Sequence, residues 1–212
     1  MSTAREEILR RVRAAKGAST LETAAASYAG IDRSYQTTAT LSHEAILDLF
    51  EERLREYDAN VFRVSALEVG AAVTEVLRSR KIERVLIPEG LPEDWQRGAE
   101  FVVDREFSAT ELDGFTAVMT TATVGIAETG TIVLQTAPGQ GRRAITLVPD
   151  YHLCLLPVIS VVETVVEAMR LLELTKNLPT TFFSGPSATA DIEMTRIKGV
   201  HGPRFVDVIL MN

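Results

Sequence analysis

Residues 114–157 read GFTAVMTTATVGIAETGTIVLQTAPGQGRRAITLVPDYHLCLLP, and this stretch decides the fold. Three apolar runs within it, 116–119, 131–134 and 153–156, are each short enough for a buried strand. Segments rich in glycine, threonine, proline and charged residues separate these runs. Because α/β folds place their sites at polar corners beside buried strands, we expect the key corner at residues 120–123 and 127–130.

The chain around this stretch alternates between strand and helix patterns. Capping boxes at Ser65/Glu68 and Thr164/Glu167 predict two helix starts, and Ser42 caps a helix with one apolar stripe. Strand–helix–strand order at this spacing indicates parallel strands with right-handed crossovers. We therefore predict a three-layer α/β domain with a mostly parallel sheet over residues 58–212. Further strands are expected at 61–64, 84–87, 101–103, 180–183 and 205–210.

Residues 1–57 have a different character and are predicted to form a helical N-terminal arm. Thr3 and Glu6 fit a capping box, and Ile8, Leu9 and Val12 then recur at helical spacing. Residues 17–40 are poor in large apolar groups, so we interpret them as a linker or an arm lying on a neighbour, with a mobile tail as the alternative. A helix beginning after Ser42 completes the arm.

Composition excludes several classes of protein. The 212 residues carry a formal net charge of −7, which argues against nucleic acid or an anionic membrane as the main partner. No apolar run approaches the roughly 18–20 residues of a membrane span, and the charged start does not resemble a signal peptide, so a cytoplasmic protein is expected. Cys154 is the one cysteine, which excludes an intrachain disulfide and an iron–sulfur cluster held by this chain alone. We expect no cofactor in this chain.

Three segments are candidates for chemistry. Glu128, Thr129 and Gly130 place a carboxylate at a tight backbone approach, although a solvated turn explains them equally well. His152 stands at a strand mouth and is suited to acid–base work near neutral pH; a structural hydrogen bond is the simpler explanation. SGPSATADIE, residues 184–193, follows a strand and precedes an expected helix start, where backbone N–H groups suit an anion.

Other polar residues are open to two readings. PGQGRR supplies Arg142 and Arg143, which either clamp an acidic group or are solvated, and VHGPR presents His201 between two sharp turns. His152, His201, Asp191 and Glu193 together have ligand chemistry, but no HExxH-type spacing supports a metal, and none is expected.

Three motifs together closely resemble the LUD-domain family, and within it the lactate utilisation protein C branch: TTATVGIAETGTIVL, GQGRRAITLVPDYHLCLL and FFSGPSATADIEMTRIKGVHGPR. The resemblance spans roughly residues 40–211. It implies a fold like that of the NagB/RpiA/CoA-transferase superfamily and a role in oxidising L-lactate to pyruvate. It also implies two partner proteins, A and B, that carry the iron–sulfur chemistry. AETG is similar to the segment in which CoA transferases carry their nucleophilic glutamate, with Glu128 at the matching position.

These observations leave three functions open. The first is the cluster-free subunit of a lactate-oxidising system that binds a small carboxylate or phosphate, or its partner subunits. The second is a stand-alone acyl- or CoA-transferase with Glu128 as nucleophile, and the third is a non-catalytic metabolite sensor; a homo-oligomer is compatible with each. One cleft at the carboxyl ends of the parallel strands is expected to hold the site. Its expected catalytic residues are Glu128, His152 and His201, and its expected ligand-binding residues are Thr121, Thr123, Thr129, Gly130, Arg142, Arg143, Ser184, Gly185, Pro186, Ser187, Asp191 and Glu193.

Overall fold

The computed structural model describes residues 3–16, 21–190, 196–199 and 201–212, and the chain divides into two compact units, Met1–Tyr35 and Gln36–Asn212. The first unit contains α1 (Ala4–Lys16) and α2 (Leu21–Ala29). The predicted capping box of α1 is present, since Thr3 N donates to Glu6 Oε2 at 2.8 Å and Glu6 N donates to Thr3 Oγ1 at 3.3 Å. α2 was not expected; its alanine-rich sequence favours a helix even without an apolar stripe.

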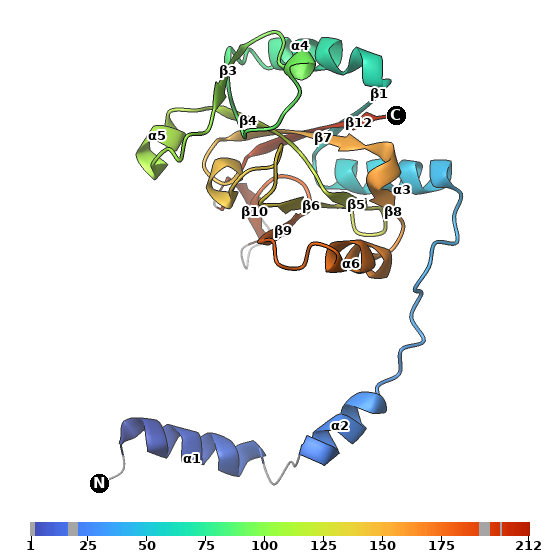
Figure 1. Ribbon diagram of the computed structural model, residues 1–212, viewed down its shortest axis with the longest axis vertical. Helices are drawn as coiled ribbons and strands as arrows, with labels where there is room; N and C mark the ends of the chain where they lie inside the picture. The colour runs from blue at the N-terminus through green and yellow to red at the C-terminus, as the bar shows by residue number, and fades with distance from the viewer. Residues whose placement is uncertain (1–2, 17–20, 191–195, 200) are drawn as a thin grey trace. The chain divides into compact units, whose positions relative to one another are not determined.

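The second unit is organised on a six-stranded sheet in which every neighbouring pair is parallel, which confirms the predicted α/β class (Figure 1). Each predicted strand run of this sheet is present within a residue or two. In spatial order the strands are β1 (Asn60–Val64), β12 (Phe205–Met211), β7 (Tyr151–Pro157), β4 (Ala117–Thr121), β2 (Arg84–Ile87) and β3 (Glu100–Val103).

One face of this sheet is covered by α4 (Val69–Ser79), which follows η1 (Ala66–Glu68) and the predicted capping box at Ser65. Val73 and Leu77 of α4 are fully buried and pack in one cluster with Val85, Met119 and Leu155 of the sheet. These strands alternate apolar residues toward both faces, as expected for a parallel sheet buried on both sides.

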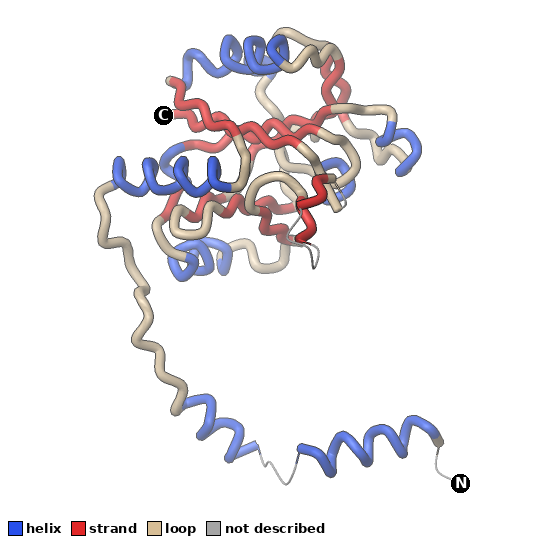
Figure 2. Tube along the Cα trace, turned by 180° about the vertical axis from the view of Figure 1, so that it is seen from behind, coloured by secondary structure: helices blue, strands red, loops and turns tan. Residues whose placement is uncertain are grey.

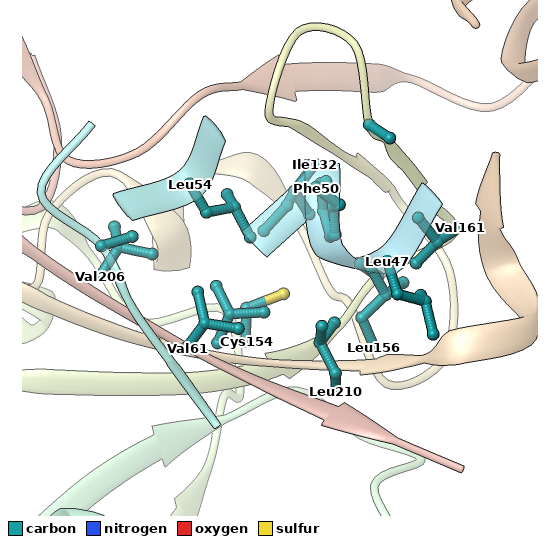
Figure 3. Close-up of a cluster of buried hydrophobic side chains, with 14 of the residues drawn as sticks. Leu47, Phe50, Leu54, Val61, Ile132, Cys154, Leu156, Val161, Val206 and Leu210 are labelled. Atoms are coloured by element: carbon teal, nitrogen blue, oxygen red, sulfur yellow. The ribbon is translucent and has the colours of Figure 1, made fainter. Parts of the chain in front are cut away.

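The opposite face is covered by α3 (His43–Glu56) and by a second sheet, as the two views show (Figures 1 and 2). Phe50 and Leu54 of α3 are fully buried against Cys154 and Leu156 of β7 and against Ile132 of the second sheet (Figure 3). α3 therefore lies in the core of the Gln36–Asn212 unit, whereas the sequence analysis assigned it to the arm. Its apolar stripe is what the sheet face needs for burial.

The second sheet is a four-stranded, mixed sheet whose outer face is covered by α6 (Val165–Glu173). β5 is antiparallel to β6 and parallel to β8, and β6 is antiparallel to β9. The capping box predicted at Thr164 and Glu167 opens α6. In spatial order the strands are β8 (Val161–Val162), β5 (Val124–Ile126), β6 (Thr131–Gln135) and β9 (Thr180–Phe183).

Two further differences from the sequence analysis concern strands. β5 and the two-residue β8 were not expected, because such short runs carry too little periodicity to be recognised. Residues after Ser187 form β10 (Ala188–Ala190), paired antiparallel with β11 (Arg196–Lys198), where a helix start was expected. The remaining elements are α5 (Ala109–Asp113), η2 (Glu93–Trp95), η3 (Arg143–Thr146) and η4 (Val158–Ser160).

A buried carboxylate ties three strands of the main sheet to α4. Asp207 of β12 is 1% exposed and accepts hydrogen bonds from Asn60 Nδ2 at 2.8 Å, Tyr151 Oη at 2.9 Å and Arg80 Nε at 2.6 Å. The Arg80 guanidinium also lies over the Tyr151 ring. This polar interruption of an apolar strand is therefore satisfied on all sides, as a buried charge requires.

Candidate functional site

A cavity of about 270 Å³ lies between the two sheets, where β9 ends and where β7 and β12 begin. η3 and Leu147 line it, together with the residues after β9 and the segment 201–203 that precedes β12. The lining residues are Leu134, Arg143, Thr146, Leu147, His152, Thr181, Phe183, Ser184, Gly185, Pro186, Ser187, His201, Gly202, Pro203 and Val206.

The cavity gathers some of the residues expected in one cleft and leaves others outside its lining. His152 and Val206 are the second residues of β7 and β12, so the cavity lies at the amino ends of these parallel strands and not at their carboxyl ends. The expected position differs because β9 and the loop after it lie over the starts of β7 and β12. Lining residues from the expected set are Arg143, His152, Ser184, Gly185, Pro186, Ser187 and His201; Thr121, Thr123, Glu128, Thr129, Gly130 and Arg142 are not among them.

His152 is the most constrained polar group at the cavity. Its side chain is 2% exposed, its Nε2 lies 2.8 Å from Thr120 Oγ1, and its ring packs at 5.4 Å from the ring of Phe183. Burial lowers the pKa of His152 to about 4, because the low-dielectric surroundings disfavour the imidazolium. The ring is therefore neutral at physiological pH and offers the cavity a hydrogen bond without a charge.

The two neighbouring arginines have different roles. Arg142 is bidentate to Asp104, with Nε–Oδ2 at 2.7 Å and Nη2–Oδ1 at 2.9 Å, and it also donates to Phe107 O at 2.6 Å. This guanidinium lowers the pKa of the Asp104 carboxyl. Arg143 is exposed, lines the cavity and has no ion pair with any residue that the structure describes. Arg143 is thus the cation available to a ligand.

The turn at Glu128 connects to the cavity through hydroxyl groups. Thr129 Oγ1 lies 2.8 Å from Thr131 Oγ1, which lies 2.8 Å from Ser184 Oγ at the cavity wall. The exposed Glu128 carboxylate accepts a hydrogen bond from Val165 N at 2.9 Å, at the first residue of α6. Gly130 closes the turn beside Arg53 of α3. Glu128 thus stabilises a helix N-terminus in this structure.

The loop after β9 is held by its own backbone. Gly185 has φ of +68°, and a Cβ atom there would lie 2.4 Å from Tyr57 Cβ, so the close approach to the end of α3 requires glycine. Ser187 N donates to Pro203 O at 2.8 Å, and His201 N donates to Ser187 Oγ at 3.0 Å. The Ser187 amide is therefore occupied, although the sequence analysis expected it to hold an anion. Asp191 and Glu193 lie outside the described residues.

Thr121, the last residue of β4, and Thr123 hold the PGQG loop in place. Thr121 N donates to Gly139 O at 2.7 Å, and Thr123 Oγ1 donates to Gln140 Oε1 at 3.0 Å. Gln140 Oε1 also accepts from Gln135 N at 2.7 Å, with both glutamines buried. This network fixes the loop that presents Arg143 to the cavity.

Among the lining residues missed by sequence reasoning, Thr146 adds a hydroxyl and Phe183 an aromatic wall. Thr120, in the expected corner 120–123, does not line the cavity, but its buried hydroxyl lies 2.8 Å from His152 Nε2. Alternation along β4 was the available signal for Thr120, because residues two apart in a strand share a face. Thr146 and Phe183 carry no comparable signal.

No group of three or more metal-ligating side chains occurs among the described residues, and no helix in that part of the chain is long and apolar enough to cross a membrane. Arg143 is the described lining residue with a permanent charge, His152, Thr146, Ser184 and Ser187 add uncharged polar groups, and His201 adds a second imidazole. Leu134, Phe183 and Val206 supply apolar contact. The arrangement therefore suits a small, singly charged anion with an apolar end.

Comparison with known proteins shows which proteins this chain resembles. The LUD domain matches residues 46–211 of the chain. A protein from Deinococcus radiodurans named "Lactate utilization protein C" is 40% identical over 181 residues, covering 84% of each chain. A protein of the same name from Oceanobacillus iheyensis is 26% identical over 203 residues, again with 84% of each chain covered. The crystal structure of a DUF162 family protein from Deinococcus radiodurans superimposes with a TM-score of 0.70 at 35% identity and covers 81% of this chain and 99% of that chain.

Proposed function

The chain belongs to the LUD domain family, and on this premise we propose that it is a component of an L-lactate utilisation system whose cavity binds a small monocarboxylate such as L-lactate or pyruvate. The names of the relatives suggest lactate utilisation as the process. The residues that line the cavity suggest the class of ligand. The proposal makes Arg143, His152 and Ser184 its ligand-binding residues.

The observation that carries the proposal is the charge balance of the cavity. Among the described residues that line the cavity, Arg143 is the one with a permanent charge, and burial keeps His152 neutral. A single guanidinium matches the single charge of a carboxylate, to which it binds as a planar fork. The apolar wall formed by Leu134, Phe183 and Val206 suits the methyl group of lactate. A volume of about 270 Å³ limits the ligand to a small molecule.

Oxidation of L-lactate to pyruvate removes two electrons and two protons, so an electron acceptor is required. The sole cysteine of this chain, Cys154, is fully buried in the core, and one thiol does not hold an iron–sulfur cluster. We therefore assign the electron transfer to partner proteins A and B with iron–sulfur clusters, and ligand binding to this chain.

A stand-alone acyl transferase would need Glu128 to reach its substrate as a nucleophile. Glu128 is not a lining residue of the cavity, and its carboxylate is bonded to the N-terminus of α6. No observation of the structure favours that function over the lactate role.

Growth tests the proposal. A strain lacking this gene and any paralogue is expected to lose growth on L-lactate and to recover it with the wild-type gene. Arg143→Ala is expected not to restore growth, whereas Arg78→Ala, in an exposed ion pair with Glu75, restores it fully. Undiminished growth of the deletion strain on L-lactate would refute the role, and rescue by Arg143→Ala would refute the site.

A further inference from the structure

A buried hydrogen-bonded pair, Thr120 and His152, stands at the wall of the cavity. Thr120 Oγ1 lies 2.8 Å from His152 Nε2. Thr120 and Cys154 are 0% exposed and are partners in the register of β4 and β7. His152 stands two residues before Cys154 on the same face of β7, so strand geometry lines up the three groups.

The other nitrogen of the imidazole faces the cavity. Among the described residues no buried side-chain nitrogen or oxygen lacks a hydrogen-bond partner, and the hydrogen bond of the His152 ring to that part of the chain is the one from Nε2. Because His152 lines the cavity, Nδ1 is the nitrogen open to it. The Phe183 ring at 5.4 Å holds the orientation of the imidazole.

The direction of this hydrogen bond follows from the acceptor strengths of the groups beside Thr120. A neutral imidazole nitrogen is a good acceptor, whereas a thiol sulfur is a weak one. Burial raises the pKa of the Cys154 thiol to about 12, so no thiolate competes for the hydroxyl proton at neutral pH. The single hydroxyl proton of Thr120 is therefore directed to His152 Nε2.

We propose that Thr120 is a positioning residue that holds His152 in its Nδ1–H tautomer, so that the imidazole donates a hydrogen bond to a ligand oxygen in the cavity. The opposite tautomer would point a lone pair at the anion. The inference rests on the proposed function for its ligand class, since a carboxylate or 2-oxo oxygen accepts what Nδ1–H donates. With Arg143 as the permanent cation among the described lining residues, the fixed neutral donor at His152 favours a monocarboxylate over a phosphate dianion.

The tautomer is measured directly in the ligand-free protein by long-range ¹⁵N–¹H correlation spectra of the three histidines. His152→Gln identifies the His152 signals by their loss. We expect wild-type His152 to show a protonated Nδ1 and an unprotonated Nε2. Thr120→Ser, which keeps the hydroxyl, should retain this pattern, whereas Thr120→Val, which is nearly isosteric, should give a mixture of tautomers or Nε2–H.

L-lactate titration of the same variants gives a second readout. Thr120→Val should weaken binding about tenfold, the loss expected for one hydrogen bond to a charged group, and Thr120→Ser should bind as the wild type does. An Nε2–H tautomer in the wild-type spectrum overturns the inference, with or without a foldable Thr120→Val variant, and so does a pattern that Thr120→Val leaves unchanged. Because the spectrum needs no ligand, a protein that shows the Nδ1–H pattern but binds no lactate refutes the proposed function and leaves the tautomer assignment standing.

Discussion

Arg142→Ala should destabilise the protein markedly, whereas the same substitution at the neighbouring Arg143 should have little effect on stability. The substitution removes a bidentate pair with Asp104, which is 9% exposed at its side chain, and the hydrogen bond to Phe107 O. Removing one partner of a fully buried ion pair costs about 3–5 kcal/mol. Because the Arg142 side chain is 34% exposed, water can replace part of the lost hydrogen bonding to Asp104. We therefore expect the free energy of unfolding to fall by about 2–3 kcal/mol.

Chemical and thermal unfolding at pH 7 measure this effect. A loss of that size corresponds to a fall in Tm of about 4–12 °C for a chain of this length. Arg143→Ala is the matched control: the same residue type, one position along, exposed and without an ion pair to the described residues, should change the free energy of unfolding by less than about 0.5 kcal/mol. If Arg142→Ala unfolds within about 0.5 kcal/mol of the wild type, the assignment of Arg142 to structure and Arg143 to ligand is refuted.

Three further predictions concern packing and pH. Gly125→Ala should lower the free energy of unfolding by about 1–3 kcal/mol, because a Cβ atom would lie 2.7 Å from Phe50 Cζ and 2.8 Å from Leu156 Cδ2. Denaturant unfolding measures this loss. Gly30→Ala is the control and should leave the free energy of unfolding unchanged, since the atom nearest to its added Cβ is 3.5 Å away. Glu163→Gln should speed amide hydrogen exchange at Thr40 and Leu41, whose N–H groups donate to the Glu163 carboxylate at 2.7 and 2.9 Å. Equal exchange rates in the variant and the wild type would show that these two hydrogen bonds do not protect the amides. These hydrogen bonds lower the pKa of Glu163. Their contribution to stability is therefore present above the unfolded-state pKa of about 4.3 and is lost as pH falls through the lower pKa of the folded state. His152 has a pKa of about 6.5 in the unfolded chain, and burial lowers its pKa to about 4 in the folded protein. The unfolded chain therefore binds more protons, and the free energy of unfolding should fall by about 2 kcal/mol from pH 7 to pH 5. A His152→Gln variant with the same dependence on pH would show that another group titrates.

Local signals predicted the framework well. The capping boxes at Ser65, Thr164 and Thr3 open helices because each needs only residues three apart. The strands of the main sheet were recognisable because parallel strands buried on both faces give continuous apolar runs. The mixed second sheet pairs β5 with β8 and β6 with β9, which are segments distant in sequence, and a three-residue strand such as β5 leaves no periodic trace.

The site was predictable only in part, for a related reason. His152, Ser184 and Arg143 stand beside recognisable strands or turns, so a polar residue there attracted attention. Arg142 and Arg143 are identical in type and adjacent, and their difference depends on Asp104, 38 residues away in the chain. The role of Thr123 likewise depends on Gln140, a residue whose buried amide has no sequence signature.

The central claim is that the cavity beside Arg143 and His152 binds a small monocarboxylate, and isothermal titration of the purified protein with L-lactate and with pyruvate tests it most directly. The account predicts one site per chain, with affinity at least tenfold weaker in Arg143→Ala and unchanged in Arg78→Ala, since each tenfold corresponds to about 1.4 kcal/mol. Inorganic phosphate should compete poorly, because the described lining residues offer one permanent cation, Arg143. Binding that Arg143→Ala leaves unaltered, or no binding of either monocarboxylate by the wild-type protein, would contradict the account.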